Sequence, residues 1–105
     1  MNSRNKIKRR QRKENPFQIK PMGVCPVQAW GNLPNGEYYY FRSRHAHWRL
    51  EICESESMWW SGGEKIYLFR HIEEYGTDHQ ASWITTRQAI KFATKAIKIY
   101  LNQNP

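Results

Sequence analysis

The sequence has few cysteines and no long apolar segment. Its two cysteines, Cys25 and Cys53, are too few for the disulfide framework that stabilises many small secreted domains. No segment approaches the roughly 20 apolar residues that a membrane-spanning helix needs. The basic N-terminus is not followed by the apolar stretch of a secretory signal. We therefore expect a soluble protein of a reducing compartment, the cytoplasm, with no membrane partner.

Acidic residues are scarce at both ends of the chain. Residues 1–20 contain eight Lys or Arg and one acid, Glu14, and residues 81–105 contain four Lys or Arg and no acid. Residues 21–80 contain eight acids and five Lys or Arg, so the net charge of +8 comes from the two ends. A basic arm attached to a folded core is common in proteins that approach phosphate-rich polymers.

The length and composition indicate one small domain. Only 39% of the 105 residues are hydrophobic, but the chain has five Trp and six Tyr, whose rings bury a large area from few positions. Residues 1–20 are polar and like-charged, which predicts a disordered, flexible basic arm. Residues 21–105 are expected to form the single folded domain.

The alternation of apolar residues predicts four strands, at 27–33, 37–43, 47–54 and 64–72. The turn at Pro34–Gly36 is typical of a hairpin, and a second tight turn is expected at Arg44–Ala46. The spacing of Thr85 and Gln88 is that of a capping box, which predicts a helix over 85–102. The expected fold is therefore α+β, a four-stranded antiparallel β-meander with one C-terminal helix packed on one face.

The two turns predict which residues face each other and which face is the core. Phe41 is expected opposite Leu50, Tyr39 opposite Ile52, and Ala29 beside Phe41, so these side chains share one apolar face. The predicted helix has an apolar arc that fits this face, with small residues at its centre. Its members are Ala89, Ala93, Ala96, Ile97, Tyr100 and Leu101.

The opposite sheet face combines aromatic rings with arginines. Its members are Trp30, Tyr38, Tyr40, Arg42, Arg44 and Arg49. Single-stranded nucleic acids bind proteins through rings that stack on bases and cations that follow the phosphates. We therefore predict a non-catalytic protein that binds RNA or single-stranded DNA. The three rings would stack on bases and the three arginines would hold phosphates, while the arm would add affinity independent of sequence through Arg9, Arg10, Arg12 and Lys13.

The segment 58–63, with adjacent Trp59 and Trp60, leaves an alternative open. If it is extended, one of the two rings is expected in the core and the other exposed, or both fold back over the aromatic face. An exposed Trp beside Arg is also typical of protein–protein hot spots. The alternative is thus an interaction or inhibitor module that docks on a nucleic-acid-handling protein. The oligomeric state stays open, because an exposed sheet edge can pair with a second copy.

Metal binding and catalysis have weaker support. His45 and His47 form a His-x-His pair, but Cys25 and Cys53 should lie roughly 20 Å apart along the strands, so no complete ligand set is expected. Glu73, Glu74, Asp78 and His79 are close in sequence, yet no nucleophile or phosphate-loop motif accompanies them. We expect no metal, no cofactor and no enzymatic activity.

Overall fold

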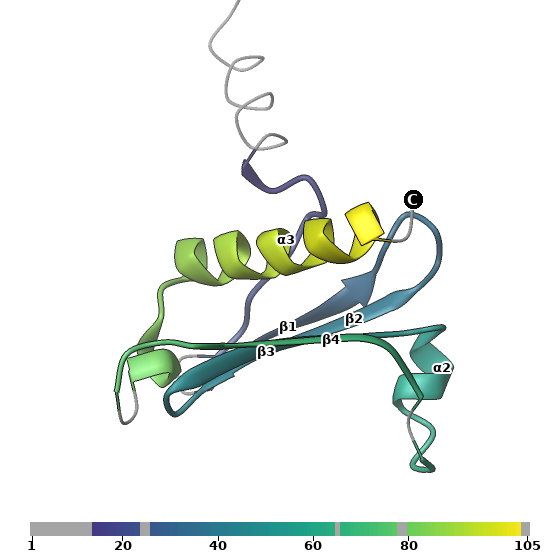
Figure 1. The fold of residues 1–105 in the computed structure, drawn as a ribbon, viewed down its shortest axis with the longest axis horizontal. Coiled ribbons are helices and arrows are strands. Elements are labelled where there is room, and N and C mark those ends of the chain that lie inside the picture. The colour runs from purple at the N-terminus through teal and green to yellow at the C-terminus, as the bar shows by residue number, and fades with distance from the viewer. Residues whose placement is uncertain (1–13, 24–25, 65, 78–79, 104–105) are drawn as a thin grey trace, which may run out of the picture.

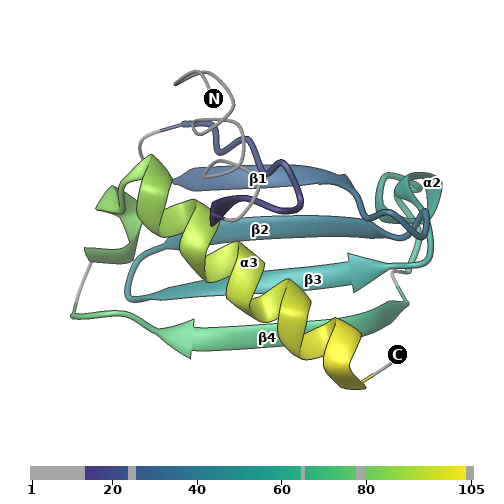
Figure 2. The same cartoon turned by 90° about the horizontal axis from the view of Figure 1, so that it is seen from above.

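The computed structural model describes residues 14–23, 26–64, 66–77 and 80–103. A single antiparallel sheet has the order β1-β2-β3-β4, and one long helix crosses one of its faces (Figures 1 and 2). The strands are β1 (Val27–Asn32), β2 (Tyr38–Arg44), β3 (His47–Cys53) and β4 (Tyr67–Glu74), and the long helix is α3 (Thr86–Gln103). This architecture confirms the predicted α+β meander with a C-terminal helix. The arm residues 1–13 lie outside the described part of the chain.

Two short helices lie in segments for which the sequence predicts neither a strand nor a helix. The first is α2 (Glu56–Trp59), between β3 and β4, and the second is the 3-10 helix η1 (Gln80–Trp83), just before α3. The Ser55 side chain caps α2 by accepting a hydrogen bond of 3.2 Å from the backbone N–H of Met58. A single-turn helix has too few residues to leave a periodic pattern in the sequence, which is why neither was predicted.

The predicted register is confirmed in both hairpins. Phe41 pairs with Ala29 on β1 and with Leu50 on β3, and Tyr39 pairs with Ile52. The turns that produce this register each contain a left-handed residue. Gly36 has φ of +89° in the first, and His45 has φ of 59° in the second. Glycine has no Cβ to clash there, and histidine is among the residues enriched in this conformation.

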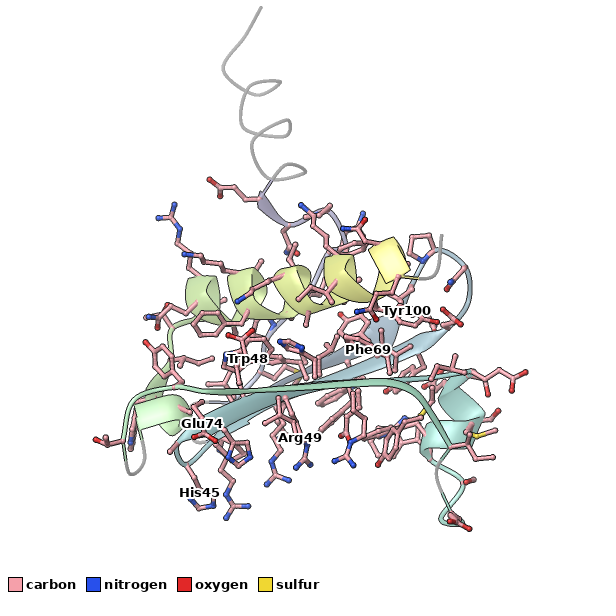
Figure 3. All side chains as sticks on the ribbon, viewed as in Figure 1. His45, Trp48, Arg49, Phe69, Glu74 and Tyr100 are labelled. Carbon is pink, nitrogen blue, oxygen red and sulfur yellow. The ribbon has the colours of Figure 1, made fainter. Side chains whose placement is uncertain are left out.

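The main core lies between the sheet and α3, and large rings meet small helix residues in it. Ala89, Ala93 and Ala96 are fully buried at the centre of the helix face, so its backbone can approach the sheet closely. Trp48 is 1% exposed and stacks on Phe92 of α3, with ring centroids 5.3 Å apart. Figure 3 shows Trp48, Phe69 and Tyr100 in the layer between the sheet and the helix.

The N-terminus of α3 has the predicted capping box. The Gln88 backbone N–H donates to Thr85 Oγ1 at 3.1 Å, and the Thr85 backbone N–H donates to Gln88 Oε1 at 2.8 Å. The Gln88 side-chain amide also donates to the Tyr75 hydroxyl at 3.0 Å, which ties the helix start to the end of β4. None of the helices within the described ranges is long and apolar enough to cross a membrane.

The packed chain begins before the expected boundary at residue 21. Ile19 is 2% exposed and belongs to the core, with Phe17 packed against it. The Asn15 side chain makes two hydrogen bonds to the backbone of Ile19, at 2.8 and 2.9 Å. The placement of residues 15–20 in the flexible arm is therefore corrected. Two apolar side chains in this short segment are enough to attach it to the domain.

We predict that Leu50→Ala lowers the free energy of unfolding by about 2–5 kcal/mol, because it opens a cavity at a fully buried position in the central part of the sheet. The matched control is Leu68→Ala, since Leu68 is 45% exposed and the chemical change is the same. Urea denaturation of both variants measures the difference. The control should change stability by about 0.5 kcal/mol, and equal losses at both positions would contradict the described core.

Two core tyrosines predict a loss of stability at alkaline pH. Burial raises the pKa of Tyr39 from 10.0 to about 12, and burial together with the nearby Glu37 carboxylate raises that of Tyr100 to about 12. The unfolded chain therefore releases these protons first, so the contribution of the two tyrosines to the free energy of unfolding should be constant below pH 10 and fall between pH 10 and 12. Urea denaturation over this range measures the fall. Tyr100→Phe removes one of the titrating groups and should make it less steep.

Candidate nucleic-acid interface

The sheet face away from α3, here called the outer face, is divided into a covered half and an open half. The α2 segment lies against the end of the sheet where β2 begins and β3 ends (Figure 1). There it closes a second small core, which consists of Tyr38, Tyr40, Cys53 and Trp59, with Met58 and Tyr67 packed against them. The other half lies toward the turn between β2 and β3 and carries mainly arginine and histidine.

Trp59 is the residue that covers the aromatic half. Its ring stacks on that of Tyr40 with centroids 4.7 Å apart and an interplanar angle of 22°. It also contacts the rings of Tyr38 and Tyr67, at 6.4 and 6.1 Å. The cap at Ser55 starts the helical turn that carries Trp59 back over the sheet. Trp59 is accordingly 7% exposed, as expected if one of the two adjacent rings is buried.

This cover changes the roles expected for two tyrosines. Tyr38 is 1% exposed and Tyr40 is 8% exposed, so neither ring has a free face on which a base could stack. The expectation that they bind bases is corrected, because Trp59 occupies the position that a base would need. The neighbouring Trp60 is 59% exposed, and its indole N–H donates to the Tyr38 hydroxyl at 3.0 Å.

Trp30 is the one predicted stacking residue with an accessible ring. It is 41% exposed and stacks at 6.4 Å on Tyr40, whose hydroxyl donates a hydrogen bond to Gln28. Its orientation is thus set by a buried neighbour, while part of the indole faces solvent. Rings outside the predicted set are also exposed, including Trp83 in η1 at 63%. Trp83 lies outside every strand and helix that the sequence predicts, so no pattern indicated its exposure.

A buried carboxylate lies between the two halves. Glu51 is 2% exposed, with one oxygen 3.2 Å from Arg49 Nε and the other 2.9 Å from Arg70 Nε. The Arg70 guanidinium also lies over the Tyr67 ring, 4.8 Å from its centroid. A buried carboxylate needs such cations to compensate its lost hydration. Sequence alternation placed Glu51 on this face but could not show that it is buried and positions two arginines.

The open half contains a small basic cleft of about 150 Å³, which we call the arginine–histidine cleft. It is lined by Arg42, Arg44, His45, His47 and Arg49. Three of these are the predicted phosphate-binding arginines, which the fold brings together. Figure 3 shows His45 and Arg49 pointing away from α3 on this side of the sheet.

The two central arginines of the cleft face each other. Arg42 and Arg49 are direct partners in the register of β2 and β3, and like charges placed opposite each other are destabilising. The Nε atoms of both are buried and make no hydrogen bond to the described part of the chain, although Arg49 Nε forms the ion pair with Glu51. The nearest acid in the register is the buried Glu51, which already pairs with Arg49 and Arg70. Because no acidic side chain of the described residues lines the cleft, this arrangement offers positive charge to an anion.

The residues considered for metal binding and catalysis are dispersed. His71 and Glu73 lie on the helix side, where Glu73 contacts His71 at 2.7 Å and Lys95 at 2.9 Å. The hydrogen bond from His71 is the main reason why the pKa of Glu73 is lowered. Glu74 lies on the outer face, and Cys25, Asp78 and His79 lie outside the described residues. Within the described ranges, no three His, Cys, Asp or Glu residues converge on a metal site.

Comparison with known proteins assigns neither a family nor a fold relative. No family model, no curated protein and no solved structure matches this chain. The case for a function therefore rests on the outer face and on the charge distribution of the chain.

We predict that the two adjacent tryptophans differ sharply in their effect on stability. Trp59→Ala should cost about 3–5 kcal/mol of unfolding free energy, since the ring closes the second core. Trp60→Ala should cost about 1 kcal/mol, because it removes mainly the hydrogen bond to Tyr38. Thermal and urea denaturation of the pair tests this. A larger loss for Trp60→Ala would contradict the described packing of α2.

Proposed function

We propose that this is a small non-catalytic protein that binds RNA or single-stranded DNA on the open half of its outer face. The observation that carries the proposal is the pair of facing arginines in the arginine–histidine cleft. Arg42 and Arg49 repel each other across the two strands, and no acidic side chain in the described part of the chain lines the cleft that they share. A phosphate would supply the missing negative charge and the acceptor oxygens. Charge-assisted hydrogen bonds from arginine to phosphate are among the strong ones in proteins.

The proposal favours a single strand over a duplex because of Trp30. This ring lies on the outer face beside Tyr40 of β2. Arg42 is two residues further along β2 than Tyr40, on the same face. At about 3.3 Å per residue, a base stacked on Trp30 would have its phosphate within reach of the cleft. Stacking requires an unpaired base, and every base offers a ring face, so the expected recognition is tolerant of sequence.

The charge balance of the face and of the chain supports an anionic ligand. Glu51 is already paired to two arginines, so it does not repel an incoming phosphate strongly. The four arm cations Arg9, Arg10, Arg12 and Lys13 lie outside the described residues. Their proposed contribution is additional, sequence-independent affinity through counterion release. Action in the cytoplasm stays an expectation from the sequence.

A protein partner is the second candidate, and the exposure of Trp60 favours it. Trp60 is 59% exposed at the end of α2, and an exposed Trp is typical of interaction hot spots. Trp59 no longer supports this candidate, since its ring is 7% exposed. Docking on a nucleic-acid-handling protein would then depend on Trp60 and not on the cleft.

The first test is a fluorescence titration of the purified protein with a mixed-sequence single-stranded oligonucleotide at several salt concentrations. Trp30→Ala should weaken binding by about 1–3 kcal/mol, the contribution of one stacked base. Its control is Trp83→Ala, which removes a more exposed ring elsewhere. Arg42→Ala should weaken binding and reduce the slope of log K against log salt by about 0.7. Its control is Arg87→Ala on α3, where the side chain is 89% exposed.

The outcomes separate the candidates. Salt-dependent binding that falls in Trp30→Ala and Arg42→Ala, but not in their controls, would support the outer face. Salt-dependent binding that is equal in all four variants would leave the arm as the phosphate binder and contradict the role of the cleft. Affinity that does not change with salt, or no binding at all, would contradict the proposal and favour a protein partner at Trp60.

A further inference from the structure

The two edges of the sheet differ in how they are covered. The edge of β1 is met by the N-terminal segment, where Met22 and Gln28 exchange two backbone hydrogen bonds of 2.6 and 2.8 Å. β4 is the last strand in the sheet order, and no described segment pairs with its outer side. Figure 2 shows β4 at the margin of the sheet. Its backbone N–H and C=O groups on that side are available to another strand.

Exposed apolar side chains accompany this edge. Three of the large hydrophobic residues with high exposure are Ile66 at 66%, Leu68 at 45% and Ile72 at 53%. Proteins often protect an exposed edge with proline or with short strands. β4 has eight residues and no proline. Ile72 lies on the outer face beside Arg49. The strand therefore exposes an apolar side chain whose burial by a partner would be favourable.

A bulge defines the part of β4 that can pair regularly. The register with β3 shifts between Ile52 and Cys53, so that Ile52 faces Phe69 and Cys53 faces Tyr67. From Phe69 to Glu74 the pairing is regular. A bulge twists the strand locally and interrupts its ladder. A partner strand would therefore pair with the segment after the bulge, whose sequence is Phe-Arg-His-Ile-Glu-Glu.

This segment is complementary to itself in one register. If two copies pair antiparallel about a two-fold axis through Ile72, then Ile72 faces Ile72, Arg70 faces Glu74 and His71 faces Glu73. In this arrangement the Ile72 pair is apolar, and the two Arg70–Glu74 pairs are opposite in charge. Arg70 is 49% exposed and contacts Glu51 through Nε, so its guanidinium can also reach a second carboxylate.

The neighbouring registers are less favourable. An axis through Arg70 would place two arginines opposite each other, and an axis through Glu73 would do the same with two glutamates. An axis through His71 would pair Phe69 with Glu73 and Leu68 with Glu74. Like charges directly opposite on adjacent strands are destabilising, and opposite charges are stabilising. Charge complementarity thus selects a second copy of this chain as the partner and Ile72 as the centre.

We propose that the protein forms a symmetric dimer through antiparallel pairing of β4 with β4, centred on Ile72. The two four-stranded sheets join into one continuous sheet. The two-fold axis is perpendicular to the sheet, so both α3 helices lie on one side and both outer faces on the other. The proposal goes beyond the proposed function and holds whether or not the outer face binds nucleic acid.

The experiment is sedimentation of the full chain over a wide concentration range, with a complementary pair of charge reversals. In a dimer of Arg70→Glu, each of the two pairs formed by positions 70 and 74 consists of two glutamates. In a dimer of Glu74→Lys, each of these pairs consists of an arginine and a lysine. Each variant alone should weaken dimerisation about tenfold or more, since two attractive pairs become repulsive. An equimolar mixture restores opposite charges in both pairs and should recover the dimer. Glu54→Lys, an equal charge change at an exposed site outside β4, should leave it unchanged.

Arg70→Glu places a second carboxylate beside Glu51 and could prevent folding, so a further variant is needed. Ile72→Lys changes an exposed residue and brings two lysines together on the axis, so it should abolish the dimer while circular dichroism stays unchanged. The proposal is wrong if the natural chain is a monomer at all concentrations. It is also wrong if Glu74→Lys and Ile72→Lys dimerise as the natural chain does, or if two folded charge variants fail to form a dimer when mixed.

Discussion

The pairing register of β2 with β3 is the constraint on which the rest of the molecule depends. Side chains alternate along a strand, so this register sends Tyr39, Phe41 and Ser43 under α3 and leaves Tyr40 and Arg42 on the other face. A shift by one residue would bury arginines beneath the helix and expose Phe41. The left-handed turn residue His45 fixes this register at the β2–β3 turn, and Gly36 does the same for the pairing of β1 with β2.

Glu51 connects the two proposed surfaces. Its buried carboxylate holds Arg49, which lines the arginine–histidine cleft, and Arg70, which lies on the β4 edge. A buried charge without such partners would be strongly unfavourable. The same ion pairs that stabilise the middle of the outer face therefore also fix the direction of one guanidinium at each proposed site. The network explains how a sheet face can carry aromatic rings and several cations side by side.

The α2 segment determines how much of the outer face is available. Without Trp59, the rings of Tyr38, Tyr40 and Tyr67 would form a contiguous exposed apolar patch, which few monomeric proteins tolerate. With it, the aromatic half becomes a second core, and of the three rings predicted to stack on bases Trp30 alone keeps an accessible face. The surface available for stacking on bases is thereby smaller than the sequence predicts, and arginine side chains make up more of the open half than aromatic rings do.

Much of this protein follows from its sequence alone. Period-two alternation, the hairpin turn at Pro34–Gly36 and the Thr85 capping box predict the four strands, the register of β1 to β3, the core face and the helix, because each is a local property of the chain. The fourth strand, expected at 64–72, is observed at Tyr67–Glu74 with a bulge in its pairing to β3. Only the tertiary structure decided that Trp59 and not Trp60 covers the outer face, that Glu51 is buried between two arginines, and that Ile19 belongs to the core. Those outcomes depend on contacts between segments that are distant in sequence. A local pattern of residues does not indicate which distant segment a side chain will contact.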